Sequence, residues 1–248
     1  MAKVLIILSA ASVLPLPNGE TLPVGFSAKE FILPYQIFLE HGLEVDVATP
    51  RGKPATMDVA SLNPRYHGHD EGRVLNLIEQ LAEIEGWQSP LSLDRLALTT
   101  ANYECVFFPD GSAQLDDLFQ SPQVGNMIKR TLASDGLVGA VGYGQAALLA
   151  AQHADKWLFS GYKMTCFSVD ESTQNGMEGR FLGNLQDRLQ AAGGLLSYGP
   201  SGGEHVVVDR QLYTGQNQAS VGKLAWELAR RLKKLSALDK ASCGTPCD

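Results

Sequence analysis

Short apolar runs alternate along most of the chain with longer segments in which apolar residues recur every three or four positions. Residues 3–8 (KVLIIL) form the first run, which is typical of a strand covered on both faces. A helix is predicted at 26–41, where Gly42 can cap the C-terminus and Pro34 can kink the middle. The alternation also predicts strands at 43–48, 104–108, 139–141, 163–167 and 205–209, and helices at 71–85, 121–135, 178–191 and 218–235.

Strands that alternate with helices in this way are joined by right-handed crossovers and form a mainly parallel sheet. The predicted fold class is therefore α/β: a doubly wound, flavodoxin-like, mainly parallel sheet with helices on both faces, a three-layer sandwich. Residues 1–236 are expected to form a single domain with an excursion at about 50–100. Residues 237–248 are expected to be a disordered tail.

Ligands of doubly wound sheets bind beyond the carboxyl ends of the strands. The predicted loops at that edge begin near Ser9, Thr49, Pro109, Gly142 and Ser168. The loop near Gly142 belongs to residues 139–149 (GAVGYGQAALL), which predict a strand, a tight turn and a helix. This layout is a nucleophile elbow, which projects a nucleophilic side chain from the turn. Gly142 stands at the projecting position, so this elbow offers no nucleophilic side chain.

Composition and charge narrow the classes of partner. The chain has 248 residues, 44% of them hydrophobic, and a formal net charge of −7. A nucleic acid or an anionic membrane surface would need a dense basic face, which this charge argues against. No apolar run approaches the ~20 residues of a membrane span, so we expect a cytosolic protein that binds neither nucleic acid nor membrane.

The cysteines and histidines predict neither a disulfide framework nor a metal site. Cys105 and Cys166 lie in apolar runs, where a thiol behaves as a small hydrophobic group with a raised pKa. Cys243 and Cys247 lie in the polar tail without a second ligand pair nearby. Residues 67–70 (HGHD) are predicted to form a solvated turn rather than a chelate. No metal ion and no cofactor are expected.

Three stretches resemble one family. They are residues 25–54 (GFSAKEFILPYQIFLEHGLEVDVATPRGKP), residues 106–118 with 138–151 (VFFPDGSAQLDDL, VGAVGYGQAALLAA), and residues 205–220 (HVVVDRQLYTGQNQAS). Together they resemble the ThiJ/PfpI superfamily of class I glutamine amidotransferase-like proteins. The branch is the one that contains heat-shock holding chaperones and cofactor-independent glyoxalase III, and the similarity runs in order across nearly the whole chain.

The resemblance implies an active site built from three places. Members carry a glutamate four residues before a proline, which Glu30 and Pro34 match. They carry Pro-Gly-Gly-His-Gly after a central strand, whose backbone N–H groups form an oxyanion hole. At the elbow they carry Ala-Val-Cys-His-Gly-Pro, whose thiolate attacks a carbonyl beside the protonated glutamate. His205 matches a further histidine of the family, and it is interpreted first as structural.

This sequence keeps the glutamate and departs elsewhere. In the oxyanion loop Gly111 is retained, but Asp110 and Ser112 replace the second and fourth residues, and a carboxylate there has the wrong sign for stabilising negative charge. At the elbow Gly142 takes the cysteine position and Tyr143 the histidine position, while Gly144 allows close packing. An acidic third partner is expected after residues 163–167, at either Asp170 or Glu171.

Two functional hypotheses of different classes follow, with a third as a weaker alternative. The first is a non-catalytic or divergent member that binds a small carbonyl-type ligand through Asp110, Gly111, Ser112, Gly142, Gly144 and His205, or acts as a holdase for unfolded protein. The second is a cysteine-independent hydratase, lyase or isomerase that uses Glu30 and Tyr143 as acid and base. The third retains glyoxalase III or deglycase activity. A homodimer is expected from the resemblance.

Overall fold

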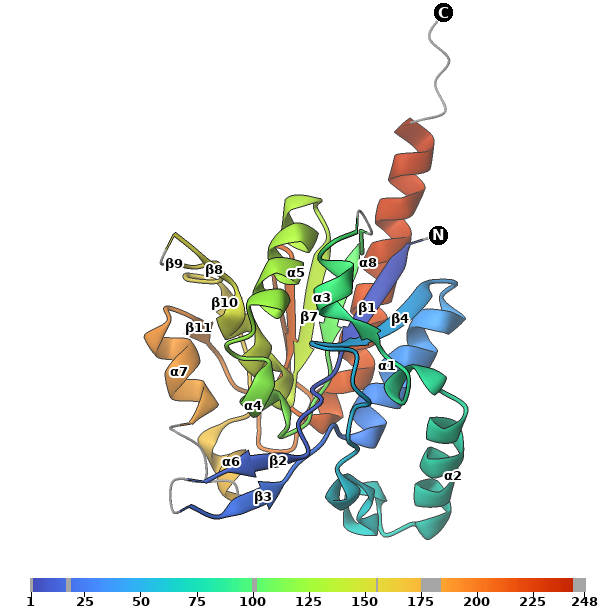
Figure 1. Ribbon diagram of the computed structural model, residues 1–248, viewed down its shortest axis with the longest axis vertical. Coiled ribbons are helices and arrows are strands. Elements are labelled where there is room, and N and C mark those ends of the chain that lie inside the picture. The colour runs from blue at the N-terminus through green and yellow to red at the C-terminus, as the bar shows by residue number, and fades with distance from the viewer. Residues whose placement is uncertain (1, 17–18, 100–101, 155, 175–183, 243–248) are drawn as a thin grey trace, which may run out of the picture.

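The computed structural model describes all residues except 1, 17–18, 100–101, 155, 175–183 and 243–248. Within these residues the main sheet has seven strands in the order β12-β13-β7-β6-β1-β4-β5, all parallel except β12, which pairs antiparallel with β13 (Figure 1). The strands are β1 (Lys3–Ile7), β4 (Glu44–Thr49), β5 (Leu91–Ser92), β6 (Cys105–Phe108), β7 (Leu137–Val141), β12 (Val206–Asp209) and β13 (Leu212–Gly215).

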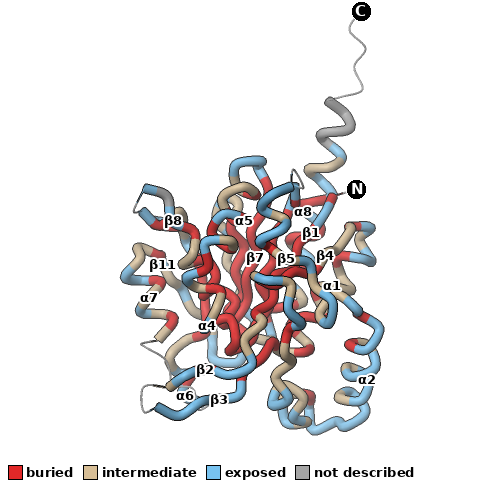
Figure 2. The backbone as a smooth tube through the Cα atoms, viewed as in Figure 1, coloured by how far each residue is buried: buried red, intermediate tan, exposed pale blue. Residues whose placement is uncertain are grey.

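Helices cover both faces of the sheet, as the fold class predicted. One face packs against α1 (Ala28–Glu40) and α8 (Val221–Ser242), and α2 (Glu71–Ala82) packs on α1. The other packs against α5 (Pro122–Ala133), the 3₁₀ helix η4 (Gly142–Ala150) and α7 (Leu185–Ala191). Along β1 the side chains alternate, so that Val4 and Ile6 enter the first core and Leu5 and Ile7 the second. Both cores appear as the buried centre of Figure 2.

The remaining elements are short and connect this framework. They are β2 (Val13–Pro15), β3 (Thr21–Pro23), η1 (Val59–Leu62), η2 (Pro64–His67), η3 (Glu85–Trp87), α3 (Leu93–Leu96), α4 (Gln114–Asp117), β8 (Gln152–His153), β9 (Lys156–Trp157), β10 (Lys163–Met164), α6 (Val169–Gln174), β11 (Leu195–Leu196) and η5 (Gln218–Ser220). The segment from 9 to 25 contains the β2–β3 hairpin, and the segment from 50 to 100 contains α2 and the edge strand β5.

One predicted strand was confirmed only in part, and the main sheet contains two strands, β5 and β13, that were not predicted. Only Lys163–Met164 of residues 163–167 form a strand, and this strand, β10, pairs with β11 outside the main sheet. The strand that pairs with β7 at this side of the sheet is β13, a four-residue strand that was not predicted. The cause is a hairpin turn at Arg210, whose φ of 55° reverses the chain directly after β12.

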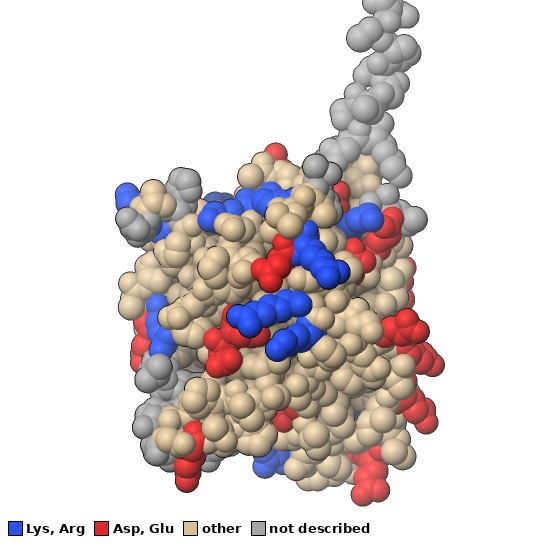
Figure 3. Space-filling model, viewed as in Figure 1, with Lys and Arg blue, Asp and Glu red and all other residues tan. Residues whose placement is uncertain are grey.

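Two predicted helices differ at their ends. Helix α7 begins at Leu185, and residues 178–183 of the predicted 178–191 helix lie outside the described residues. Helix α8 continues to Ser242, so residues 237–242 of the expected tail are helical, whereas 243–248 are not described. Among the described residues, no helix is both long and apolar enough to cross a membrane. Acidic and basic side chains lie side by side on the face shown in Figure 3.

Candidate functional site

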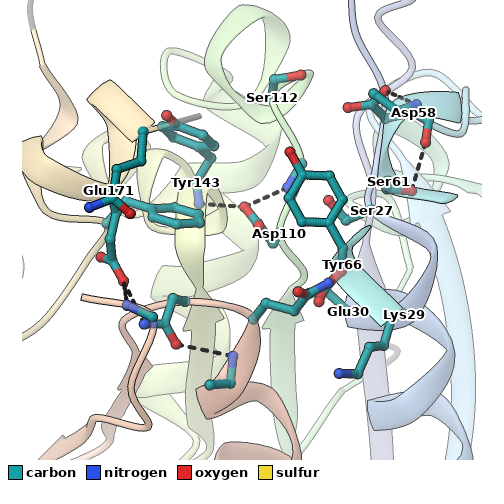
Figure 4. A pocket seen from close by; sticks show the side chains of 18 of the residues that line it. Ser27, Lys29, Glu30, Asp58, Ser61, Tyr66, Asp110, Ser112, Tyr143 and Glu171 are labelled. Carbon is teal, nitrogen blue, oxygen red and sulfur yellow. Dashed lines mark hydrogen bonds between the residues drawn. The ribbon is translucent and has the colours of Figure 1, made fainter. Parts of the chain in front are cut away.

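A cavity of about 590 Å³ lies at the carboxyl ends of the central strands. Its lining includes residues from the loop after β6, from η4, from the first turn of α1 and from the segment after β13 (Figure 4). The chain leaves β1 toward β4 on one side, while β6 and β7 lie on the other side of β1. The cavity is therefore placed at the topological switch point, where ligands of this fold class bind.

The loop after β6 is locked against the start of α1. Gly111 has a φ of 154°, and a Cβ atom added to it would lie 2.5 Å from the carbonyl oxygen of Gly25 and 2.6 Å from the Cα atom of Phe26. Ser27 donates its backbone N–H to the carbonyl oxygen of Asp110 at 2.9 Å. This close approach needs glycine at 111, and it brings the first turn of α1, with Glu30, beside Asp110.

The Asp110 carboxyl group accepts hydrogen bonds from two backbone N–H groups, one in its own loop and one at the elbow. Its Oδ1 atom accepts a hydrogen bond from the N–H of Gly111 at 2.8 Å and from the N–H of Tyr143 at 2.7 Å. Donors from the residue after an elbow and from a neighbouring loop are the usual parts of an oxyanion hole. An internal carboxylate therefore takes the place that the oxygen of a tetrahedral intermediate would occupy.

The same carboxylate fills the space above Gly142. Gly142 has a φ of 60°, and a Cβ atom built there would lie 2.3 Å from Oδ1 and 2.4 Å from Cγ of Asp110. A side chain at the elbow and the observed position of Asp110 exclude each other on steric grounds. Gly142 is thus required by its neighbour as well as by its backbone conformation.

Burial raises the pKa of Asp110 to about 7. The hydrogen bonds from Tyr143 and Gly111 oppose the shift, and the nearby Asp58 and Glu171 carboxyl groups add to it. Since a free aspartate has a pKa near 4, this group is poised to gain or lose a proton close to neutral pH.

Glu30 is the second carboxyl group of the cavity with a pKa raised to about 7. Burial is the largest cause, repulsion from Asp110 the next, and the Gln218 side chain and Lys29 oppose the shift. The residue is 1% exposed, and its carboxyl oxygens make no hydrogen bond of good geometry among the described residues, although its own backbone N–H and the Gln218 side chain lie near enough to lower its pKa. The glutamate picked out from the sequence therefore lies in the cavity, beside an acidic group rather than beside a thiol.

Tyr143 lines the cavity, but its hydroxyl group does not converge with Glu30 as expected. The hydroxyl donates to Oγ of Ser172 at 3.3 Å, and the ring lies against Phe167 with the ring centres 4.9 Å apart. In Figure 4 the hydroxyl end of Tyr143 points away from Asp110, which lies between Tyr143 and Glu30. Burial raises the pKa of Tyr143 to about 12, so the phenol stays protonated at neutral pH.

Glu171, rather than Asp170, is the acidic residue that faces inward. Asp170 is exposed, whereas Glu171 is buried and lines the cavity. Its Oε1 accepts from Asn217 Nδ2 and the Gly202 N–H, and its Oε2 from the Ser168 N–H, Ser168 Oγ and Gln216 Nε2. These five donors come from three separate segments, so this carboxylate holds the wall of the cavity together.

Of the other residues predicted to bind a ligand, some line the cavity and some lie outside it. Gly111 and Ser112 line it, as expected. His205 lies outside its lining, with its ring against Ser197 and its backbone N–H bonded to Ser220 Oγ, so its position does not support a ligand contact. Gly144 serves packing, since a Cβ atom there would lie 2.3 Å from the Phe108 carbonyl oxygen.

The buried thiols are not placed for chemistry. Cys166 donates to the Phe167 carbonyl oxygen at 3.3 Å and lies outside the cavity lining, and burial raises its pKa to about 12. Burial also raises the pKa of Cys105, which lies inside β6. Among the described residues, no group of three His, Cys, Asp or Glu side chains is arranged to hold a metal ion.

Sequence reasoning missed one wall of the cavity, which is formed by Asp58, Ser61, Arg65 and Tyr66. An isolated bridge between Phe26 and Met57 docks this segment beside α1. Asp58 caps η1 by accepting from the Ala60 N–H, and Ser61 Oγ accepts from the Ala28 N–H at 3.2 Å. An aspartate before a helix is a helix-start signal that can be read from the sequence. The sequence does not show that Asp58 lines the same cavity as Glu30.

Comparison with known proteins decides the family. A family model described as ThiJ/PfpI family-like matches residues 23–177. The chain belongs to the ThiJ/PfpI family. Its sequence is 31% identical over 134 residues to the glutamine amidotransferase-like class 1 domain-containing protein 1 of Danio rerio, spanning 54% of this chain and 62% of that protein.

Two further relatives connect this ThiJ/PfpI member with proteins named for their activity. The protein/nucleic acid deglycase HchA of Escherichia coli O7:K1 is 27% identical over 234 residues, across 90% of this chain and 79% of that protein. The crystal structure of glyoxalase III from Candida albicans matches with a TM-score of 0.73 at 18% identity, covering 92% of this chain and 96% of that one. The latter likeness shows a shared fold.

The raised pKa values of this ThiJ/PfpI site predict how stability depends on pH. Glu30 has a pKa of about 7 when folded and about 4.3 when unfolded, so its contribution is complete below about pH 4 and is lost as pH rises through 7. Relative to wild type, Glu30→Gln is expected to raise the free energy of unfolding at pH 8 by about 1–3 kcal/mol and to change it little at pH 4. Urea denaturation at both pH values measures this, and an equal effect at both would contradict it.

Proposed function

We propose that this ThiJ/PfpI-family protein binds a small polar molecule non-covalently in the cavity above Asp110 and Glu30, without thiol chemistry. The observation that carries the proposal is the Asp110 carboxylate on the N–H groups of Gly111 and Tyr143. Acyl-type catalysis needs those donors for a developing oxyanion, and here they are already engaged by an anionic oxygen.

The lack of a nucleophile at the elbow supports the same function. Gly142 has no side chain, and both described cysteines are buried with raised pKa values. The thiolate rather than the thiol is the nucleophile, so neither Cys105 nor Cys166 is fit to attack a carbonyl. The cavity of about 590 Å³ nevertheless has the size of a small-molecule site.

Incubation with methylglyoxal tests this proposal against the activities that the names of the relatives indicate. We expect no lactate above the level of a protein-free sample. A cysteine-containing glyoxalase III serves as the positive control. Saturable lactate formation would overturn the proposal.

A second candidate function, acid–base catalysis on a small carbonyl compound, is favoured by the two neighbouring carboxyl groups. Glu30 and Asp110 each have a pKa of about 7, the range in which a group can both take and give a proton at neutral pH. Asp110 replaces Tyr143 as the expected partner of Glu30, because the Tyr143 hydroxyl bonds to Ser172.

Variants of the pair test the second candidate. If a hydratase, lyase or isomerase activity is found, Glu30→Gln and Asp110→Asn are each expected to lower kcat/KM by at least ~100-fold. Tyr143→Phe keeps the ring against Phe167 and is expected to leave kcat/KM within about a factor of ten, the effect of losing one neutral hydrogen bond. Loss of activity in Tyr143→Phe with full activity in Asp110→Asn would reverse the assignment.

A further inference from the structure

Four carboxyl groups line the cavity, and they outnumber its cationic side chains. The acids are Glu30, Asp58, Asp110 and Glu171, and the cations are Lys29 and Arg65. Arg65 is exposed, hydrogen-bonds the Tyr66 hydroxyl and lies over the Tyr66 ring. The Tyr143 phenol, whose pKa burial raises to about 12, carries no charge at neutral pH. The buried side of the cavity is therefore acidic, and its positive charge lies toward the exterior.

The carboxyl oxygens on the buried side of the cavity differ in how many hydrogen bonds they accept from the protein. All the acceptor capacity of Glu171 is directed at five donors of the protein itself. By contrast, both oxygens of Glu30 are buried and make no hydrogen bond of good geometry among the described residues. Asp110 uses Oδ1 for its two backbone donors, and no described hydrogen bond reaches its Oδ2.

Buried acceptors without donors are costly unless a ligand or water supplies the donors. The two carboxyl oxygens of Glu30 have this property, and Asp110 Oδ2 beside them makes no described hydrogen bond within the protein. The elbow N–H groups, which would otherwise attract an anionic or carbonyl oxygen, are occupied. The ionised Glu30 and Asp110 carboxyl groups therefore offer acceptors, rather than donors, to a ligand.

We propose that the cavity binds small molecules through a primary ammonium group placed on the Glu30 and Asp110 carboxylates. This inference rests on the proposed function and names the chemical class of its ligand. An ammonium group carries three N–H donors and no acceptor, so it can donate to the two buried Glu30 oxygens and to Asp110 Oδ2. Its positive charge also offsets the repulsion between the Glu30 and Asp110 carboxylates, whereas a ligand carboxylate would add to it.

Three probes that differ only at one end test the ligand class. They are 4-amino-1-butanol, 1,4-butanediol and 4-hydroxybutanoate, measured by calorimetric titration of the full-length protein at pH 6, 7 and 8. We expect the amino alcohol to bind at least about tenfold more tightly than the diol, because hydrogen bonds to charged groups are the stronger kind, and 4-hydroxybutanoate to bind most weakly. The affinity for the amino alcohol is expected to rise from pH 6 to pH 8 as the carboxyl groups ionise.

Substitutions test whether the amino alcohol binds at Glu30 and Asp110. Glu30→Gln and Asp110→Asn keep the shape of each side chain and are expected to weaken amino alcohol binding about tenfold and to flatten its pH dependence. Asp170→Asn removes one negative charge from an exposed position outside the cavity lining and is expected to leave binding unchanged. Thermal denaturation confirms that each variant is folded.

The outcomes separate this inference from the function on which it rests. Equal affinity for diol and amino alcohol, or no binding of the amino alcohol, would overturn the ammonium site. Equal weakening by Asp170→Asn and Glu30→Gln would also overturn it, because the effect would then reflect net charge alone. The non-covalent function is judged separately, by lactate formation from methylglyoxal.

Discussion

Replacing Gly142 by cysteine is expected to destabilise the protein without creating a reactive thiol. The added Cβ atom would lie 2.3 Å from Oδ1 and 2.9 Å from Oδ2 of Asp110, and the backbone has a φ of 60°. Overpacking and a strained backbone together cost about 2–5 kcal/mol. Urea denaturation measures the loss, and alkylation by iodoacetamide at pH 7 is expected to be no faster than for the wild type.

A matched control separates the collision from the backbone strain. Gly161 has a similar φ of 76°, but a Cβ atom added there meets nothing within 4 Å. Gly161→Cys is therefore expected to cost only the conformational part, about 1–2 kcal/mol. If both cysteine variants lost the same stability, the Asp110 carboxylate would not occupy the space above the elbow.

Combining Gly142→Cys with Asp110→Ala tests the collision directly. The alanine removes Oδ1, Oδ2 and Cγ, the three atoms that an added Cβ would meet. The double variant should lose less stability than the sum of the single variants, with a coupling of at least about 1 kcal/mol. The same change frees the N–H groups of Gly111 and Tyr143, so any thiol reactivity should appear in the double variant first.

The layered fold could be predicted from the sequence because each buried strand is a short apolar run. β1 and β6 are buried on both faces, and their residues 3–8 and 104–108 stand out against the polar segments around them. β13 could not be predicted in the same way. Its four residues, LYTG, contain two polar or small side chains, and Thr214 uses its hydroxyl group to accept from the Thr165 N–H.

Several residues of the cavity lining, among them Glu30, Asp110 and Tyr143, were predicted from the sequence, but the direction of their side chains was not. The sequence shows that Asp110 replaces a glycine of the oxyanion loop, yet it does not show that the carboxylate turns back onto the N–H groups of its own site. That direction depends on the contact of Gly111 with Gly25, between residues far apart in the chain. For the same reason Tyr143 was paired with Glu30 although its hydroxyl reaches Ser172.

Asp170 and Glu171 are adjacent in helix α6, but only Glu171 faces the cavity. Two adjacent acids at the start of α6 are equivalent in composition, and the sequence analysis left both open. Neighbouring residues of a helix point about 100° apart, so only one can face the cavity. The docking of α6 against Gln216 and Asn217, which no local pattern reveals, selects Glu171.

Glu171→Ala is expected to cause the largest loss of stability of any single change considered for the cavity. It leaves five donors, from Ser168, Gly202, Gln216 and Asn217, without their acceptor in a buried place. Breaking a buried, hydrogen-bonded charged group costs about 3–5 kcal/mol, which lowers the Tm by roughly 6–20 °C in a chain of this length. Urea denaturation and calorimetry at pH 7 measure both quantities.

The adjacent exposed acid provides the control. Asp170→Ala removes the same charge from the same helix and is expected to stay within about 0.5 kcal/mol of the wild type. If Glu171→Ala is no more costly than Asp170→Ala, the five hydrogen bonds do not hold the wall of the cavity. If Glu171→Ala is the more costly change, the role of Glu171 is to join α6 to the loop at Gly202 and to the segment after β13. A structural role for Glu171 leaves the proton chemistry of the cavity to Glu30 and Asp110, whose carboxyl groups have pKa values of about 7.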